Sequence, residues 1–281
     1  MTPQEKFCPK LFSDALLQEQ TVIHDGFQKI SRLCNFWFVI YEIRARGDKH
    51  ITASKESILL AIKFRIVGKL RFLSHAETVR IFQRACIRAG IGIRYSQGYN
   101  PRPKLSLPLP RSVGIESDDD LLCVQAFRPI DSQSETSEFL FDSEQFKARL
   151  SSQLPEGCEL LTVSVSDAKT SFQPRLATYV LAVRREYFDD ELKVRIKRLL
   201  GSESLTLERR REPGSPEFKN VDVRGFLKSV QIIVNQGCIV VECKISPAGS
   251  IRVEEILKLL ELDTERLAAP VRRTKVQWEE A

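Results

Sequence analysis

The sequence has few residues that bind metals or clusters, and they are poorly spaced for that chemistry. Its 281 residues include seven cysteines and three histidines. A radical S-adenosylmethionine enzyme needs three closely spaced thiolates to hold its cluster, whereas the nearest cysteine pair here is Cys238 and Cys243. No C-x2-C or H-x3-H pair occurs, which argues against a structural zinc site. We therefore expect no metal site and no cofactor in this chain.

Long apolar runs and secretory features are also missing. The longest apolar run near the start, residues 36–41, is far shorter than the roughly 20 residues of a membrane-spanning helix. Scattered cysteines in an odd number, without a signal-peptide pattern, indicate a reducing compartment. We predict a cytoplasmic protein without a membrane segment. The content of 42% hydrophobic and 28% charged residues is ordinary for a soluble protein with one large or two modest domains.

Acidic residues are nearly absent from one stretch of the chain. Between residues 61 and 114, eleven Lys and Arg stand against one acid, Glu77, which gives a local net charge of +10. The whole chain carries only +6. A basic module inside an otherwise slightly acidic chain is typical of a surface that meets phosphate or another polyanion. The charge pattern favours a nucleic-acid partner without identifying a reaction.

The first 57 residues lack sustained periodicity, and we predict a poorly ordered N-terminal extension there. The alternative is a helix and a strand docked on the core. From residue 58 the pattern becomes regular, with a helix opened by a capping box at Ser74 and Glu77 and stopped at Gly90. The predicted order over residues 58–168 is strand 60–67, this helix, strand 104–109, an acidic turn 116–120, strand 121–127, a polar linker 131–138, helix 143–154 and strand 158–165.

A similar order returns between residues 174 and 281. We predict strand 176–183, helix 189–200, strand 205–210, loop 211–216, a hairpin of strands 225–234 and 238–245, helix 253–262 and strand 271–278. Each order contains the β-α-β-β-α-β succession of the ferredoxin-like motif. The fold class predicted is therefore α+β, with two tandem ferredoxin-like units at residues 58–168 and 174–281, the first basic and the second elaborated.

Residues 96–106 form the most specific segment. Two prolines hold Arg102 in an extended conformation, and Gly98 permits a tight turn. A loop this stiff presents its side chains in advance, as cations for phosphate and aromatic rings for a base. Its cations are Arg102 and Lys104, and the neighbouring aromatic residues are Tyr95 and Tyr99. The alternative is that these residues only shape a connection and that the tyrosines pack.

His75 stands directly after the predicted N-cap Ser74. The helix macrodipole disfavours a charged imidazolium there, so a neutral imidazole that relays a proton is one interpretation. A hydrogen-bonded structural histidine is the other. No catalytic residue is assigned, and His75 is the candidate.

Three arginines, Arg80, Arg84 and Arg88, recur every four residues along the same helix. A helix face laid out for stability alone would alternate signs at this spacing, and this one does not. Two interpretations remain open: the three arginines contact phosphates of a partner, or they form only a solvent-exposed face of the helix.

The stretch containing LSHAE, YSQGYNPRPK and GIES resembles the signature of the radical SAM-linked protein family, domain of unknown function 2344, in its standalone form. The resemblance is strong over residues 62–122. Where the family has Leu-Asp after the histidine, this chain has Ala76 and Glu77. The positions that it implicates are Arg71, Ser74, His75, Tyr95, Ser96, Gly98, Asn100, Pro101, Pro103, Lys104, Gly114, Glu116 and Ser117.

Members of this family occur alone or fused to radical SAM modules. The resemblance of this chain to the family implies a partner protein that holds a substrate, an RNA or a ribosomal component, while it is modified. We therefore expect a nonenzymatic RNA- or ribonucleoprotein-binding accessory module that presents substrate to a separate radical SAM enzyme. The alternatives are a metal-independent RNA-processing nuclease using His75 and a protein-protein adaptor with a basic docking face. The expected binding residues are Arg71, Ser74, His75, Arg80, Arg84, Arg88, Tyr95, Ser96, Tyr99, Asn100, Arg102, Lys104, Glu116 and Ser117.

Overall fold

One large, mostly antiparallel sheet and four α-helices organise the part of the chain that the computed structural model describes, residues 56–128, 143–210 and 217–280. This confirms the mixed α+β class. The predicted linker 131–138, the loop 211–216 and all but the last two residues of the predicted N-terminal extension lie outside the described residues.

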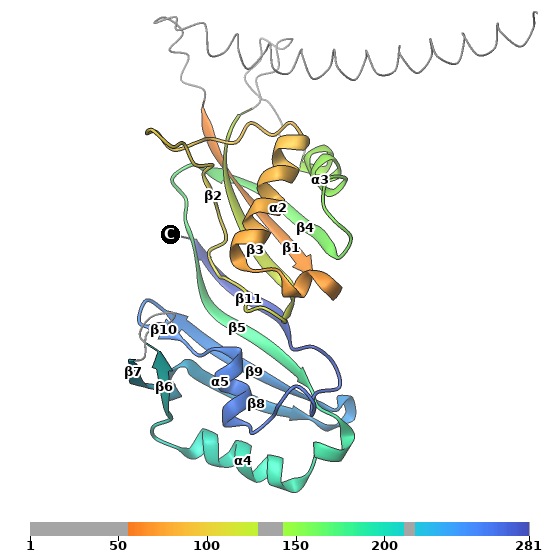
Figure 1. Cartoon of the computed structure of the whole chain (residues 1–281), viewed down its shortest axis with the longest axis vertical. Helices are drawn as coiled ribbons and strands as arrows, with labels where there is room; N and C mark the ends of the chain where they lie inside the picture. Colours follow the sequence, from red (N-terminus) through yellow and green to blue (C-terminus); the bar gives the residue numbers. More distant parts are fainter. Residues whose placement is uncertain (1–55, 129–142, 211–216, 281) are drawn as a thin grey trace, which may run out of the picture. The chain divides into compact units, whose positions relative to one another are not determined.

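The first half of the sheet has β1 at its centre. β1 pairs antiparallel with β3 on one side and β4 on the other, and the short β2 pairs with the far edge of β3. Helices α2 and α3 lie next to each other on one face of these strands (Figure 1). The elements are β1 (Ser57–Ile66), η1 (Gly68–Phe72), α2 (His75–Arg88), β2 (Leu105–Ser106), β3 (Glu116–Phe127), α3 (Ser143–Ser151) and β4 (Cys158–Asp167).

Alternation along β1 explains where the first core lies. Every second residue, from Ile58 to Ile66, points to the helix side and is buried there. Phe64 of this set meets Phe82 of α2 with ring centroids 4.5 Å apart in an edge-to-face arrangement. The intervening residues, such as Leu59, face the opposite side of the sheet, where they form a smaller apolar cluster with Cys123.

The second half repeats the same pairing scheme around β5. β5 lies between β9 and β11, β8 pairs with the far side of β9, and β6 and β7 form a separate two-stranded sheet. The elements are β5 (Phe172–Ala182), η2 (Arg185–Tyr187), α4 (Asp190–Gly201), β6 (Thr206–Arg210), β7 (Phe218–Asp222), η3 (Arg224–Phe226), β8 (Leu227–Ile233), η4 (Val234–Gln236), β9 (Cys238–Ser246), β10 (Gly249–Ser250), α5 (Val253–Leu259) and β11 (Arg272–Glu280).

A parallel contact between β11 and β3 makes the two halves one sheet. Arg272 lies opposite Glu116, and Arg273 lies opposite Ser117. The resulting order is β10-β9-β5-β11-β3-β1-β4. The last strand of the chain thus borders the first half at the point where β3 begins.

Two local predictions were wrong. The predicted acidic turn 116–120 is the start of β3, where Asp120 pairs with Phe64 of β1. Its carboxylates fit in a strand because cations on neighbouring strands neutralise them, as Lys63 does for Asp119 at 3.2 Å. The predicted strand 104–109 is reduced to the two residues of β2, since Pro103 and Pro108 cannot donate to a ladder. The hairpin between β8 and β9 is confirmed.

Candidate functional site

The sequence-predicted site residues fall into two groups separated by the length of α2. This helix has 14 residues, so its ends are about 20 Å apart. One group surrounds its start, and the other belongs to the segment after its end. The first group is Arg71, Ser74, His75, Glu116 and Ser117; the second is Tyr95, Ser96, Tyr99, Asn100, Arg102 and Lys104; Arg80, Arg84 and Arg88 lie between them on α2.

At the start of α2, the capping box is confirmed. The Ser74 backbone N–H donates to Glu77 Oε2 at 2.8 Å, and the Glu77 backbone N–H donates to Ser74 Oγ at 3.3 Å. The hydrogen bond from the Ser74 side chain lowers the pKa of Glu77. His75 is the first residue of the helix and is exposed. Ser74 and Glu77 are therefore occupied by the cap, while the imidazole faces solvent.

Glu116 is buried at the start of β3 and joins three elements. Its Oε1 accepts the Gly68 N–H of η1 at 2.9 Å, and its Oε2 accepts from Arg272 of β11 at 2.7 Å. Burial acts to raise the pKa of Glu116, but these two donors outweigh it and hold the pKa below its ordinary value. This carboxylate fastens η1 and β11 to β3.

Ser117 is fully buried in a network that sequence reasoning missed. Its hydroxyl donates to Asp120, and Asp120 Oδ1 accepts from Arg273 Nη2 at 2.6 Å. Arg111 Nη1 donates to the carbonyls of Ile115 at 2.6 Å and Arg71 at 2.8 Å. Burial lowers the pKa of Arg111. The sequence signal for this network is the run of acids at 116–120, a pattern that is also typical of a turn.

The second group forms a hairpin of residues 94–104, called here the signature hairpin. The Ser96 N–H donates to the Arg102 carbonyl at 2.7 Å, and the Arg102 N–H donates to Ser96 Oγ at 2.9 Å. Its base is bonded to β3 through Gln125, whose N–H donates to the Lys104 carbonyl at 2.9 Å. At its tip Tyr99 is 99% exposed. Asn100, Arg102 and Lys104 are exposed as well.

The arginine row on α2 (Arg80, Arg84 and Arg88) is exposed along its whole length. Within the described ranges, no ion pair joins any of the three to an acidic side chain. Other cations of the basic stretch are neutralised, for example Arg65, whose Nε lies 3.1 Å from Asp118 Oδ1. The effective basic surface is therefore narrower than the sequence count suggests, and it is concentrated on α2 and the signature hairpin.

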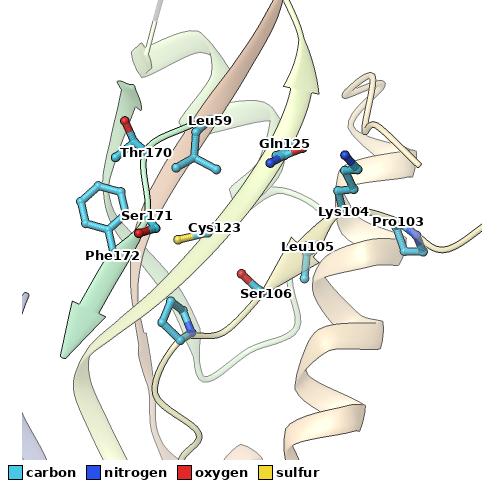
Figure 2. A pocket seen from close by; sticks show the side chains of 11 residues that line it. Leu59, Pro103, Lys104, Leu105, Ser106, Cys123, Gln125, Thr170, Ser171 and Phe172 are labelled. Atoms are coloured by element: carbon cyan, nitrogen blue, oxygen red, sulfur yellow. The ribbon is translucent and has the colours of Figure 1, made fainter. Parts of the chain in front are cut away.

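A pocket of about 480 Å³ lies at the base of the signature hairpin, called here the hairpin pocket. Figure 2 shows Cys123 and Leu59 on the sheet, Ser106 on one side and Phe172 on the other. Lys104 also lines it and is the sole charged residue among the 11 described lining residues. Of the expected binding residues, Lys104 alone lines this pocket, together with Pro103, which the family resemblance also implicates.

The described residues show no arranged metal-binding site, and their cysteines belong to none. No group of three or more His, Cys, Asp or Glu side chains there is placed to hold a metal ion. The described cysteines are free thiols, and burial raises the pKa of Cys86 to about 12. None of the helices in these ranges is long and apolar enough to cross a membrane.

These features define a mixed α+β protein with an exposed arginine row and a hydrogen-bonded basic hairpin. The chain belongs to the family DUF2344, described as an uncharacterized protein conserved in bacteria, whose model matches residues 60–258. The match runs from β1 to α5 and so includes both groups of site residues. The comparison with curated proteins gave no match.

Proposed function

We propose that this protein is a nonenzymatic accessory module that binds RNA or a ribonucleoprotein and presents it to a separate radical SAM enzyme. The link to radical SAM chemistry comes from the sequence resemblance. The RNA part is supported by the placement of charge and aromatic surface in the first half of the sheet.

The observation that carries the proposal is the signature hairpin. Backbone and side-chain hydrogen bonds between Ser96 and Arg102 close it and hold its two sides together. The tip exposes Tyr99 almost completely, which leaves a ring free to stack on a base, and it exposes Arg102 beside it. Stacking platforms next to cations are how single-stranded nucleic acids are held without sequence preference.

The arginine row adds the electrostatic component. Three exposed cations spaced at about one helical turn, Arg80, Arg84 and Arg88, provide a track for successive phosphates. The nuclease alternative assigns a proton-transfer role to His75, and the adaptor alternative assigns the row to an acidic protein. The exposed Tyr99 favours RNA over the adaptor, because a flat aromatic tip suits bases.

The finer fold interpretation, two tandem ferredoxin-like units, belongs to the same proposal. It is supported by the pairing scheme, since in each half the first strand lies between the third and the fourth and the second pairs with the third. In the second half the β6–β7 sheet is an insertion between α4 and β8. On this interpretation β11 of the second unit extends the sheet of the first.

The test is the binding of a fluorescent single-stranded RNA to Tyr99→Ala, followed by anisotropy. Loss of one stacked base costs about 1–3 kcal/mol, so we expect affinity to fall roughly tenfold. The control is Tyr187→Ala, which removes an exposed tyrosine of the second half and should bind as wild type does. Equal affinity of wild type and Tyr99→Ala would contradict the proposal. Metal-free cleavage of the RNA that is abolished in His75→Gln would support the nuclease alternative instead.

A further inference from the structure

The hairpin pocket lies on the sheet face opposite α2. Register places it there: Ser106 pairs with Cys123, and alternation directs both away from the helix side, which takes Leu105 and Val124. Leu59 of β1 faces the same way. The pocket therefore has a firm floor of paired strands, and its mouth adjoins the signature hairpin.

Its opposite wall comes from the segment that joins the two halves. Thr170, Ser171 and Phe172 approach the floor from the end of β4 and the start of β5. Figure 2 shows the ring of Phe172 across from Ser106, with Cys123 between them. The Gln125 side chain donates to the Ala168 carbonyl at 3.3 Å, which fixes this segment to the sheet. Two connecting segments, the one that contains Ser106 and the one between β4 and β5, thus form the walls of the pocket over the sheet.

The residues that line the pocket suit a ligand with an anionic group and a flat ring that forms hydrogen bonds. Lys104 provides a cation, and no carboxylate is among the described lining residues. Hydroxyls of Ser106 and Thr170 supply neutral hydrogen-bonding groups, while Phe172 supplies an aromatic surface. The volume of about 480 Å³ lies within the range of about 300–1,000 Å³ typical of small-ligand sites.

We infer that the hairpin pocket binds one nucleoside monophosphate unit, with its phosphate at Lys104 and its base against Phe172. The inference rests on the proposed function, because the unit is taken to be one nucleotide of the RNA strand that the signature hairpin holds. Lys104 belongs to both the hairpin and the pocket, so a strand that passes the tip at Tyr99 meets the pocket at the hairpin base. The pocket would fix the register of the RNA where the strand passes the base of the signature hairpin.

The experiment is ligand-observed NMR titration of the full chain with uridine monophosphate and adenosine monophosphate. Uridine, which lacks the phosphate, and inorganic phosphate, which lacks the base, are titrated alongside. We expect the monophosphates to bind at least tenfold more tightly than either fragment. Equal binding of inorganic phosphate alone would overturn the nucleotide assignment, as would the absence of monophosphate binding.

Two substitutions place the binding in the pocket. Ser106→Phe fills it from an exposed position on β2 and should abolish monophosphate binding, whereas Ser151→Phe on exposed α3 should not. Lys104→Met should weaken monophosphate binding about tenfold, and the control Lys197→Met on α4 should leave it unchanged. Thermal melts establish that each variant is folded. Monophosphate binding that survives Ser106→Phe in a folded protein would overturn the inference.

A parallel titration with a single-stranded RNA separates this inference from the proposed function. RNA binding that depends on Tyr99 but is unaffected by Ser106→Phe, without monophosphate binding, would reject the pocket and keep the function. Monophosphate binding that Ser106→Phe abolishes, in a protein that binds no RNA, would keep the pocket as a free-nucleotide site and reject the function.

Discussion

At the scale of single residues, the turn before β4 depends on Gly157. Its φ of +89° lies in the region that favours glycine, and a Cβ there would lie 2.8 Å from the carbonyl oxygen of Val67. We expect Gly157→Ala to lower the free energy of unfolding by about 2 kcal/mol or more in a denaturant titration, from backbone strain and the clash together.

The control is Gly201→Ala at the end of α4, where φ is ordinary and open space surrounds the position. That substitution should be neutral or slightly stabilising. Equal stability of Gly157→Ala and wild type would show that the turn adapts without cost.

Glu116 gives a prediction that depends on pH. Its folded-state pKa lies below the ordinary value of about 4.3, so its stabilisation is complete above that pH and is lost as the pH falls through the folded-state pKa. We expect Glu116→Gln to cost about 1.5–3 kcal/mol at pH 7, the usual contribution of hydrogen bonds to a charged group. The difference from wild type should narrow below about pH 4.3, as measured by denaturant unfolding across pH.

Glu159→Gln is the matched control, because this carboxylate is exposed and lies 3.6 Å from Arg65. It should change stability by less than about 1 kcal/mol at either pH. A stability gap for Glu116→Gln that stays constant down to pH 3 would contradict the ionised, paired carboxylate described here.

At the scale of elements, the N-terminus of α2 is the clearest case for a stability test. Ser74→Ala removes the side-chain oxygen that accepts the Glu77 N–H, and it should lower the free energy of unfolding by about 1 kcal/mol. Ser74→Thr keeps an oxygen at this position and should retain most of the stability. If both variants melt together with wild type, Ser74 does not stabilise the helix.

The capping box was predictable because its signal is local: two residues three apart, followed by an apolar period. The start of β3 was not, since strand acids are stable there only because Lys63 and the buried Arg273 lie beside them. These partners come from β1 and from a strand more than 150 residues away. The sequence around the start of β3 therefore does not reveal that these cations neutralise its acids.

The candidate site could likewise be predicted from the sequence only in part. Exposure of the signature hairpin tip followed from Gly98 and the prolines around Arg102. The sequence could not show that Glu116 and Ser117, adjacent in the same motif, are buried in a junction with β11. The hairpin pocket was likewise not predicted, because Phe172 reaches it only through the folding of the sheet.

At the scale of the whole molecule, the parallel contact between β11 and β3 places β11 beside the strands of the first half of the sheet. Trp278 of β11 and Phe172 of β5 pack against the apolar cluster that contains Leu59 and Cys123, and Leu59, Cys123 and Phe172 also line the hairpin pocket. The second half therefore contributes Phe172 to the hairpin pocket, while the arginine row and the signature hairpin lie in the first half.

The central claim is that this protein binds RNA, and the salt dependence of RNA affinity, compared between two pairs of substituted cations, tests it most directly. Arg84→Gln with Arg88→Gln on α2 is compared with Lys197→Gln with Arg198→Gln, an equal loss of charge on the exposed face of α4. Removing one phosphate-binding cation should reduce the slope of log affinity against log salt by about 0.7 for a single strand. The account predicts a slope reduced by about 1.4 for the α2 pair and an unchanged slope for the α4 pair. Equal slopes for the two double variants would contradict it.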